Sequence, residues 1–94
     1  MREHGFILDD SLPKSAQKFI ASRDPKTQEA IFAAFDTICR SPFHHPDPRR
    51  IRRLHGKLEG SFRYRLGDVR IIYRVDVANH LIIIEVVDDR GDDY

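Results

Sequence analysis

The chain is poor in cysteine and in long apolar runs, and each absence excludes a class of protein. Cys39 is the single cysteine, which excludes an internal disulfide and is typical of a protein from a reducing cytoplasm. No apolar run reaches the ~18 residues that a membrane span needs, and Glu85 interrupts the stretch LIIIEVV. The N-terminal stretch MREHGFILDD lacks the apolar segment of a signal peptide. We therefore expect a single cytoplasmic domain over residues 1–94, with no membrane partner.

Metal-ligand patterns are also missing from the sequence. His44 and His45 are neighbours, so they cannot share a ligand face as a spaced pair of histidines would. The acidic stretch DDRGDDY at residues 88–94 lacks the spacing of a calcium-binding loop. Cys39 falls in the apolar stripe of a predicted helix, where a buried structural thiol is expected. The sequence thus predicts no metal site and no cofactor.

The chain has an excess of positive charge in one segment. Residues 49–74 hold nine Lys or Arg and two acids, a local charge of +7 in a chain whose net charge is +1. Residues 85–94 hold five acids and one arginine, a local charge of −4. Such a basic zone points to a polyanionic partner, although exposed loop charges can also be a merely solvated surface.

The N-terminal half has the pattern of a short strand followed by two helices. The apolar run Gly5–Asp9 is expected to form an edge strand, and apolar residues at helical spacing predict a first helix over Leu12–Ser22. A second helix is predicted over Pro25–Arg40, because proline is favoured at the first helical position. It should end before Ser41, since a residue that precedes a proline is disfavoured in the α region.

The C-terminal half has the pattern of strands. Residues 43–53 are predicted to be a loop rich in proline, histidine and arginine, and after it apolar residues alternate. Runs over 62–66 and 69–75 flank the turn residues Gly67 and Asp68, which predicts a β-hairpin, and residues 81–87 are expected to form the last strand. The order βααβββ predicts an α+β fold in which the N-terminal strand and the helical hairpin pack on one face of an antiparallel sheet.

Arginines alternate with apolar residues along the predicted hairpin. Arg63, Arg65, Arg70 and Arg74 are therefore expected on the sheet face that the helices leave open. A purely solvated face could equally hold Lys, Thr, Glu or Gln. Arginines on adjacent strands repel one another unless an anion or an acidic segment lies among them. We interpret the face as functional.

The C-terminal half also carries motifs in a fixed order: a leucine–glycine start, an arginine-rich hairpin, and a final strand followed by arginine and tyrosine. The matching residues are Leu54, Gly56, Tyr64-Arg65-Leu66, Gly67-Asp68, Arg70-Ile71-Ile72-Tyr73, Arg90 and Tyr94. With these motifs, and with the strand and helices that precede them, the chain resembles the RelE/ParE superfamily of bacterial toxins over essentially its whole length. The resemblance implies the toxin of a type II toxin–antitoxin pair.

The resemblance to the RelE branch implies a ribosome-dependent endoribonuclease that cuts mRNA without a metal ion. The residues at catalytic positions are Arg63, Arg65, Arg70, Arg90 and Tyr94. The other basic residues, expected to bind RNA, are Arg49, Arg50, Arg52, Arg53, Lys57 and Arg74. The arginines of the loop could equally hold an acidic segment of an antitoxin. The implied partners are a cognate antitoxin, mRNA on the ribosome, and operator DNA through the antitoxin alone.

The sequence departs from its ribonuclease relatives at groups that could move protons. Arg63 and Arg65 stand where some members have lysine, and Asp89 stands where a histidine is common. Arginine binds phosphate well, but with a pKa above ~12 it is a poor base. The remaining proton carriers are a ribosomal group, Tyr94, Asp89, Asp88 or Glu85. Two alternatives stay open: a ParE-like inhibitor of DNA gyrase without catalysis, and a detoxified relative that only binds an antitoxin and co-represses the operon.

Overall fold

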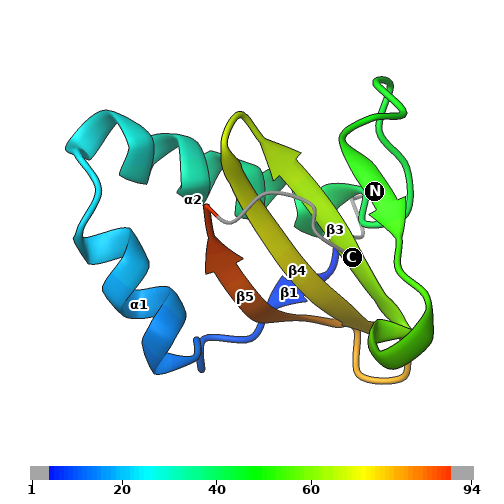
Figure 1. The fold of residues 1–94 in the computed structure, drawn as a ribbon. Helices are drawn as coiled ribbons and strands as arrows, with labels where there is room; N and C mark the ends of the chain where they lie inside the picture. Colours follow the sequence, from blue (N-terminus) through cyan, green and yellow to red (C-terminus); the bar gives the residue numbers. More distant parts are fainter. Residues whose placement is uncertain (1–4, 90–94) are drawn as a thin grey trace.

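The computed structural model describes residues 5–89, which form a five-stranded sheet with two helices on one face (Figure 1). The helices are α1 (Lys14–Ala21) and α2 (Pro25–Arg40), and a short 3-10 turn, η1, spans Gly56–Leu58. The strands are β1 (Ile7–Leu8), β2 (Ile51–Arg53), β3 (Ser61–Leu66), β4 (Val69–Asp76) and β5 (Leu81–Asp88). They lie in the order β1-β5-β4-β3-β2. β1 runs parallel to β5, and the other neighbours are antiparallel.

The predicted α+β fold with the order βααβββ is confirmed, and the structure adds one strand to it. Residues 51–53 were expected in a loop, but they form β2 and pair with β3, with Ile51 opposite Tyr64. A strand of three residues is too short to show an alternating pattern in the sequence. The parallel pairing of β1 also makes the sheet mixed rather than wholly antiparallel.

The start of the first helix differs from the prediction, and proline explains the difference. α1 begins at Lys14 rather than at Leu12, and Pro13 precedes it with an extended ψ of 148°. Leu12 lies directly before Pro13, so steric contact with the proline ring disfavours the α region there. α2 begins at Pro25 and ends at Arg40, as predicted. Among residues 5–89, no helix has the length and the apolar character needed to cross a bilayer.

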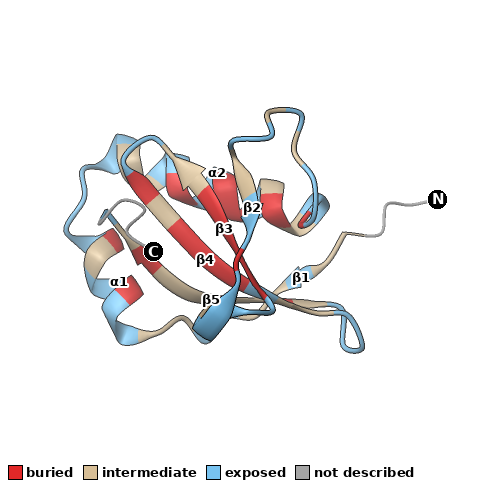
Figure 2. Ribbon diagram, turned by 45° about the vertical axis from the view of Figure 1, so that its right-hand side comes forward, coloured by how far each residue is buried: buried red, intermediate tan, exposed pale blue. Residues whose placement is uncertain are grey.

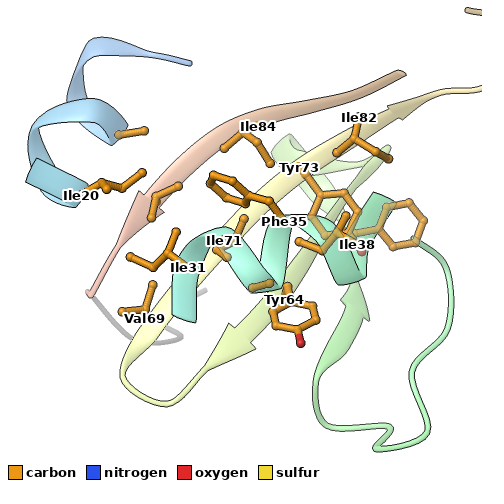
Figure 3. Close-up of a cluster of buried hydrophobic side chains, with 14 residues drawn as sticks. Ile20, Ile31, Phe35, Ile38, Tyr64, Val69, Ile71, Tyr73, Ile82 and Ile84 are labelled. Carbon is orange, nitrogen blue, oxygen red and sulfur yellow. The ribbon is translucent and has the colours of Figure 1, made fainter. Parts of the chain in front are cut away.

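The hydrophobic core lies between the helices and the inner face of the sheet (Figures 2 and 3). Alternate residues of the strands point toward α2, and Figure 3 shows Phe35 and Ile38 of that helix facing Tyr73 and Ile71. Tyr73 is fully buried, and its hydroxyl donates a hydrogen bond to the carbonyl oxygen of Pro42 at 2.5 Å. The buried members of this core are Ala16, Ile20, Ile31, Ala34, Phe35, Ile38, Phe62, Tyr64, Val69, Ile71, Tyr73, Ile82, Ile84 and Val87.

Cys39 lies at the edge of this core and is half-buried. Burial raises the pKa of its thiol, and the nearby Asp36 carboxylate raises it further. A thiol with a raised pKa is a weak nucleophile at neutral pH, which fits the structural role expected from the sequence.

Candidate nucleic-acid interface

The arginines of β3 and β4 share the sheet face opposite the helices, because they alternate with the core residues of their strands. Arg65 lies directly opposite Arg70, and Ser61 lies directly opposite Arg74. Directly opposite residues have Cβ atoms roughly 4.5–5.5 Å apart, so neighbouring arginines of this face would repel one another without counter-charges. Carboxylates of β5 supply counter-charges for the two arginines of β4.

Arg70 is held by Asp88, its partner on β5. Arg70 Nε donates to Asp88 Oδ1 at 2.6 Å, and Nη2 donates to Oδ2 at 3.2 Å. The two side chains are 13% and 25% exposed, so water screens the pair only in part. A bidentate pair of this kind fixes the plane of the guanidinium. The protein itself therefore orients Arg70.

Glu85 joins Ser61 and Arg74 toward the other end of the same face. Ser61 Oγ donates to Glu85 Oε1 at 2.7 Å, and Arg74 Nε donates to Oε2 at 3.3 Å. Ser61 is fully buried, whereas the side chains of Arg74 and Glu85 are 47% and 31% exposed. Gly60 has a φ of +94°, and a Cβ added there would lie 2.9 Å from Arg74 Nη1. These contacts hold the Glu85 carboxylate in place while solvent still reaches it.

Arg63 is buried, with 3% of its surface exposed, and it ties β3 to the loop that precedes β2. Its Nη2 donates to the carbonyl oxygen of Arg49 at 3.0 Å, and Arg50 Nη1 donates to the carbonyl oxygen of Arg65 at 3.1 Å. Arg49 in turn hydrogen-bonds Asp47, which lowers the pKa of that carboxyl group. Arg63 thus positions the backbone of the loop that carries further cations.

Cations of this loop and of β2 surround two cavities at the edge of the sheet. The larger has a volume of about 620 Å³ and is lined by Arg52, Arg53, Leu54, His55, Lys57, Leu58 and Arg63. The smaller has a volume of about 200 Å³ and is lined by Asp47, Arg49, Arg50, Arg65 and Gly67. The charged residues that line the larger cavity are all cations, so its potential favours an anion such as a phosphate.

The structure places three of the predicted catalytic residues, Arg63, Arg65 and Arg70, on the same side of the sheet, but Arg63 is buried there rather than open to solvent as expected. The predicted RNA-binding residues lie along the β2 edge, except for Arg74, which lies on β4. Arg90 and Tyr94 fall outside the described residues. Within residues 5–89, no group of three or more His, Cys, Asp or Glu could hold a metal ion.

Sequence reasoning missed the role of Ser61, and it treated Asp88 and Glu85 as proton carriers rather than as partners of arginines. Ser61 could have been found, because it alternates with Arg63 and Arg65 along the strand. The ion pairs could not have been predicted, because they depend on how β5 is aligned with β4, which the sequence alone does not reveal.

Solved structures from toxin–antitoxin systems share this fold. A chain of the RelBE2 complex from Mycobacterium tuberculosis is 25% identical with a TM-score of 0.73, covering 92% of this chain and 99% of that one. A chain of the archaeal RelE–RelB complex from Pyrococcus horikoshii OT3 is 23% identical with a TM-score of 0.72, covering 97% and 100%. The YoeB/ParE toxin from Agrobacterium tumefaciens is 18% identical with a TM-score of 0.69, covering 89% and 95%. No curated protein sequence matches the chain.

The fold is therefore that of the RelE/ParE toxins, and a match between the sequence and a family model identifies the family. The family described as ParE toxin of type II toxin–antitoxin system, parDE, matches residues 14–94. This match spans both helices and continues through β5 to the end of the sequence. The chain belongs to this family of type II toxins, as the motifs around the arginine-rich hairpin predicted.

Proposed function

We propose that this toxin inhibits translation by cutting mRNA on the ribosome, as a metal-independent endoribonuclease of the RelE type. The observation that carries the proposal is the cationic surface formed by the cations along the β2 edge together with the arginines of β3 and β4 beside them. Its arginines are held by neighbouring groups, and cavities lined by cations open beside them. Such a surface matches the repeating phosphates of an RNA strand.

In this proposal the cations divide the binding of RNA among them. Arg70 and Arg90 hold the phosphate that is cut, and Arg65 holds a flanking phosphate, while the buried Arg63 positions the loop that carries further cations. Arginine carries its N–H donors in a planar fork that matches the oxygens of a phosphate. Tyr94 stacks on a base or assists proton transfer. Arg74 holds RNA near the phosphate that is cut, and the residues that hold RNA further along the strand are Arg49, Arg50, Arg52, Arg53 and Lys57.

The proposed partner in the resting cell is a cognate antitoxin. RelBE2 is a toxin–antitoxin complex, and the archaeal structure is a complex of RelE with RelB, which supports such a partner here. An acidic segment of the antitoxin would cover the cationic surface and block access of RNA to it. Operator DNA would be bound only through that antitoxin.

A second candidate is a ParE-like inhibitor of DNA gyrase that needs no catalysis. The pairing of Arg70 with Asp88 and of Arg74 with Glu85 favours it, because these contacts give both arginines a structural purpose without RNA. The family match to ParE toxins favours it as well.

Expression of the protein alone separates these candidates, with translation, mRNA ends and DNA supercoiling followed in the same cells. Prompt loss of translation with cuts in ribosome-bound messages supports the nuclease. DNA damage signalling with intact messages contradicts it and supports the gyrase inhibitor. Absence of any growth effect contradicts both and leaves a module that only binds an antitoxin.

Variants then assign the site. Arg90→Ala and Tyr94→Ala are each expected to abolish growth arrest without unfolding the protein. Lys18→Ala, which removes an exposed cation from α1, is the matched control and should leave toxicity unchanged. Unchanged toxicity of Arg90→Ala or Tyr94→Ala would remove that residue from the site.

A further inference from the structure

We propose that Glu85 is the general base of the cleavage reaction and takes the proton from the 2′-hydroxyl of the RNA. This inference rests on the proposed function and assigns a step that the arginines cannot perform. Attack by the 2′-oxygen on phosphorus requires a proton acceptor, and arginine stays protonated at any physiological pH. A carboxylate on the arginine face can supply this acceptor.

Three carboxylates lie in the described part of the C-terminal segment, those of Glu85, Asp88 and Asp89, and each has different surroundings. Both oxygens of Asp88 accept hydrogen bonds from Arg70, at 2.6 and 3.2 Å. Asp89 lies beside the helical hairpin, 3.8 Å from Arg23, and lines a separate cavity with Ser22 and other residues of the α1–α2 connection. Glu85 therefore combines a place on the arginine face with a position beside an exposed cation.

The local geometry holds Glu85 in a defined orientation. The β4–β5 register shifts between Ile72 and Tyr73, which pair with Val86 and Ile84, so Glu85 is the extra residue of a β-bulge. Bulges re-aim side chains and are over-represented next to active sites. A carboxylate has about four acceptor sites, and Ser61 and Arg74 occupy one on each oxygen, which leaves room for a 2′-hydroxyl.

The arginines lie within reach of the same stretch of RNA. Ser61 and Arg63 are two residues apart on one face of β3, a separation of about 6.6 Å along the strand. Arg74 lies directly opposite Ser61 and carries the cation nearest to the carboxylate. The proton acceptor is therefore placed beside Arg74, on the same face of the sheet as Arg70.

The reaction balances with these groups. The O2′–H bond breaks as Glu85 takes the proton, and the electron pair of O2′ forms the bond to phosphorus. The P–O5′ bond breaks with its electron pair on O5′, which takes a proton from water. Glu85 then releases its proton to the hydroxide that remains. The products are a 2′,3′-cyclic phosphate and a 5′-hydroxyl end, while the arginines stabilise the pentavalent dianion.

The test compares single-turnover cleavage of mRNA on programmed ribosomes by the wild type, Glu85→Gln and Glu85→Asp. Glutamine has nearly the same shape, and its oxygen can accept from Arg74 while its NH2 group donates to Ser61 Oγ, but it cannot take the proton. We expect the saturating rate of Glu85→Gln to fall roughly 100- to 10,000-fold. Its half-saturating concentration should stay within about threefold of the wild type. Glu85→Asp, which keeps a carboxylate, should recover part of the rate.

Glu29→Gln, at an exposed position of α2, is the matched control and should cleave like the wild type. If Glu85→Gln cleaves like the wild type, Glu85 only positions its neighbours and the inference is overturned while the proposed function stands. If the wild type cuts no ribosome-bound message, the proposed function fails and this inference with it. Thermal unfolding checks the fold of each variant. Should Glu85→Gln not fold, Glu85→Ala decides, because alanine has no proton acceptor, and a rate equal to that of the wild type overturns the inference.

Discussion

Arg70→Met is expected to destabilise the protein as well as to remove a cation from the arginine face. The change leaves Asp88 without the guanidinium that contacts both of its oxygens, at 2.6 and 3.2 Å. Exposed ion pairs contribute about 0–1 kcal/mol, whereas removing one partner of a fully buried pair costs about 3–5 kcal/mol. The exposed fractions of 13% and 25% place this pair between those limits. We therefore expect a loss of about 2 kcal/mol in the free energy of unfolding.

For a domain of this size, such a loss lowers the melting temperature by roughly 8–16 °C. The assay is urea unfolding of the wild type, Arg70→Met, Asp88→Asn and the double variant, which together form a double-mutant cycle. The expected coupling energy is about 1–2 kcal/mol. Arg40→Met is the control, because Arg40 pairs with Asp36 at 3.4 Å with both side chains largely exposed. A coupling energy below about 0.5 kcal/mol would refute the reasoning, because independent sites add to within that amount.

Three further predictions concern the surroundings of this face. Burial raises the pKa of the Tyr73 hydroxyl above its usual 10.0, so the neutral hydroxyl stabilises the fold fully below that pH, and this contribution is lost as the pH rises. Measured by urea unfolding, the stability of the wild type should therefore fall more steeply above pH 10 than that of Tyr73→Phe. Gly60→Ala places a methyl group at a φ of +94° and against Arg74, so it should cost about 1 kcal/mol or more in thermal unfolding; an unchanged melting temperature contradicts this. NMR titration should find the pKa of Asp47 below 3.8, and Arg49→Gln should raise it.

Much of the fold follows from local patterns in the sequence. α2 begins and ends as predicted, because Pro25 and the pair Ser41-Pro42 limit it sterically whatever packs around it. The hairpin was equally predictable, since Gly67 and Asp68 separate two alternating runs. The shared face of the arginines follows from the same period of two residues. These features depend on near neighbours in the chain.

Features that depend on distant segments were not predictable in this way. β2 is a strand because β3 provides its partner, although residues 51–53, one isoleucine and two arginines, have little apolar pattern of their own. Arg63 alternates with core residues and was expected on an open surface, yet it is buried and donates to the carbonyl oxygen of Arg49. The pairing of Arg70 with Asp88 depends on the register between two strands. In each case a tertiary contact determines what the residue does.

The distribution of charge over the sheet follows from these contacts and bears on where RNA would bind. On β4, Arg70 and Arg74 each have a carboxylate from β5 within 3.3 Å, so their charges are offset within the sheet. On β2, Arg52 and Arg53 are exposed and have no ion pair among the described residues. The net positive potential of the face therefore increases from β5 toward β2. An RNA strand would gain most of its electrostatic attraction at the β2 edge, while the oriented groups of β4 and β5 would determine which phosphate is attacked.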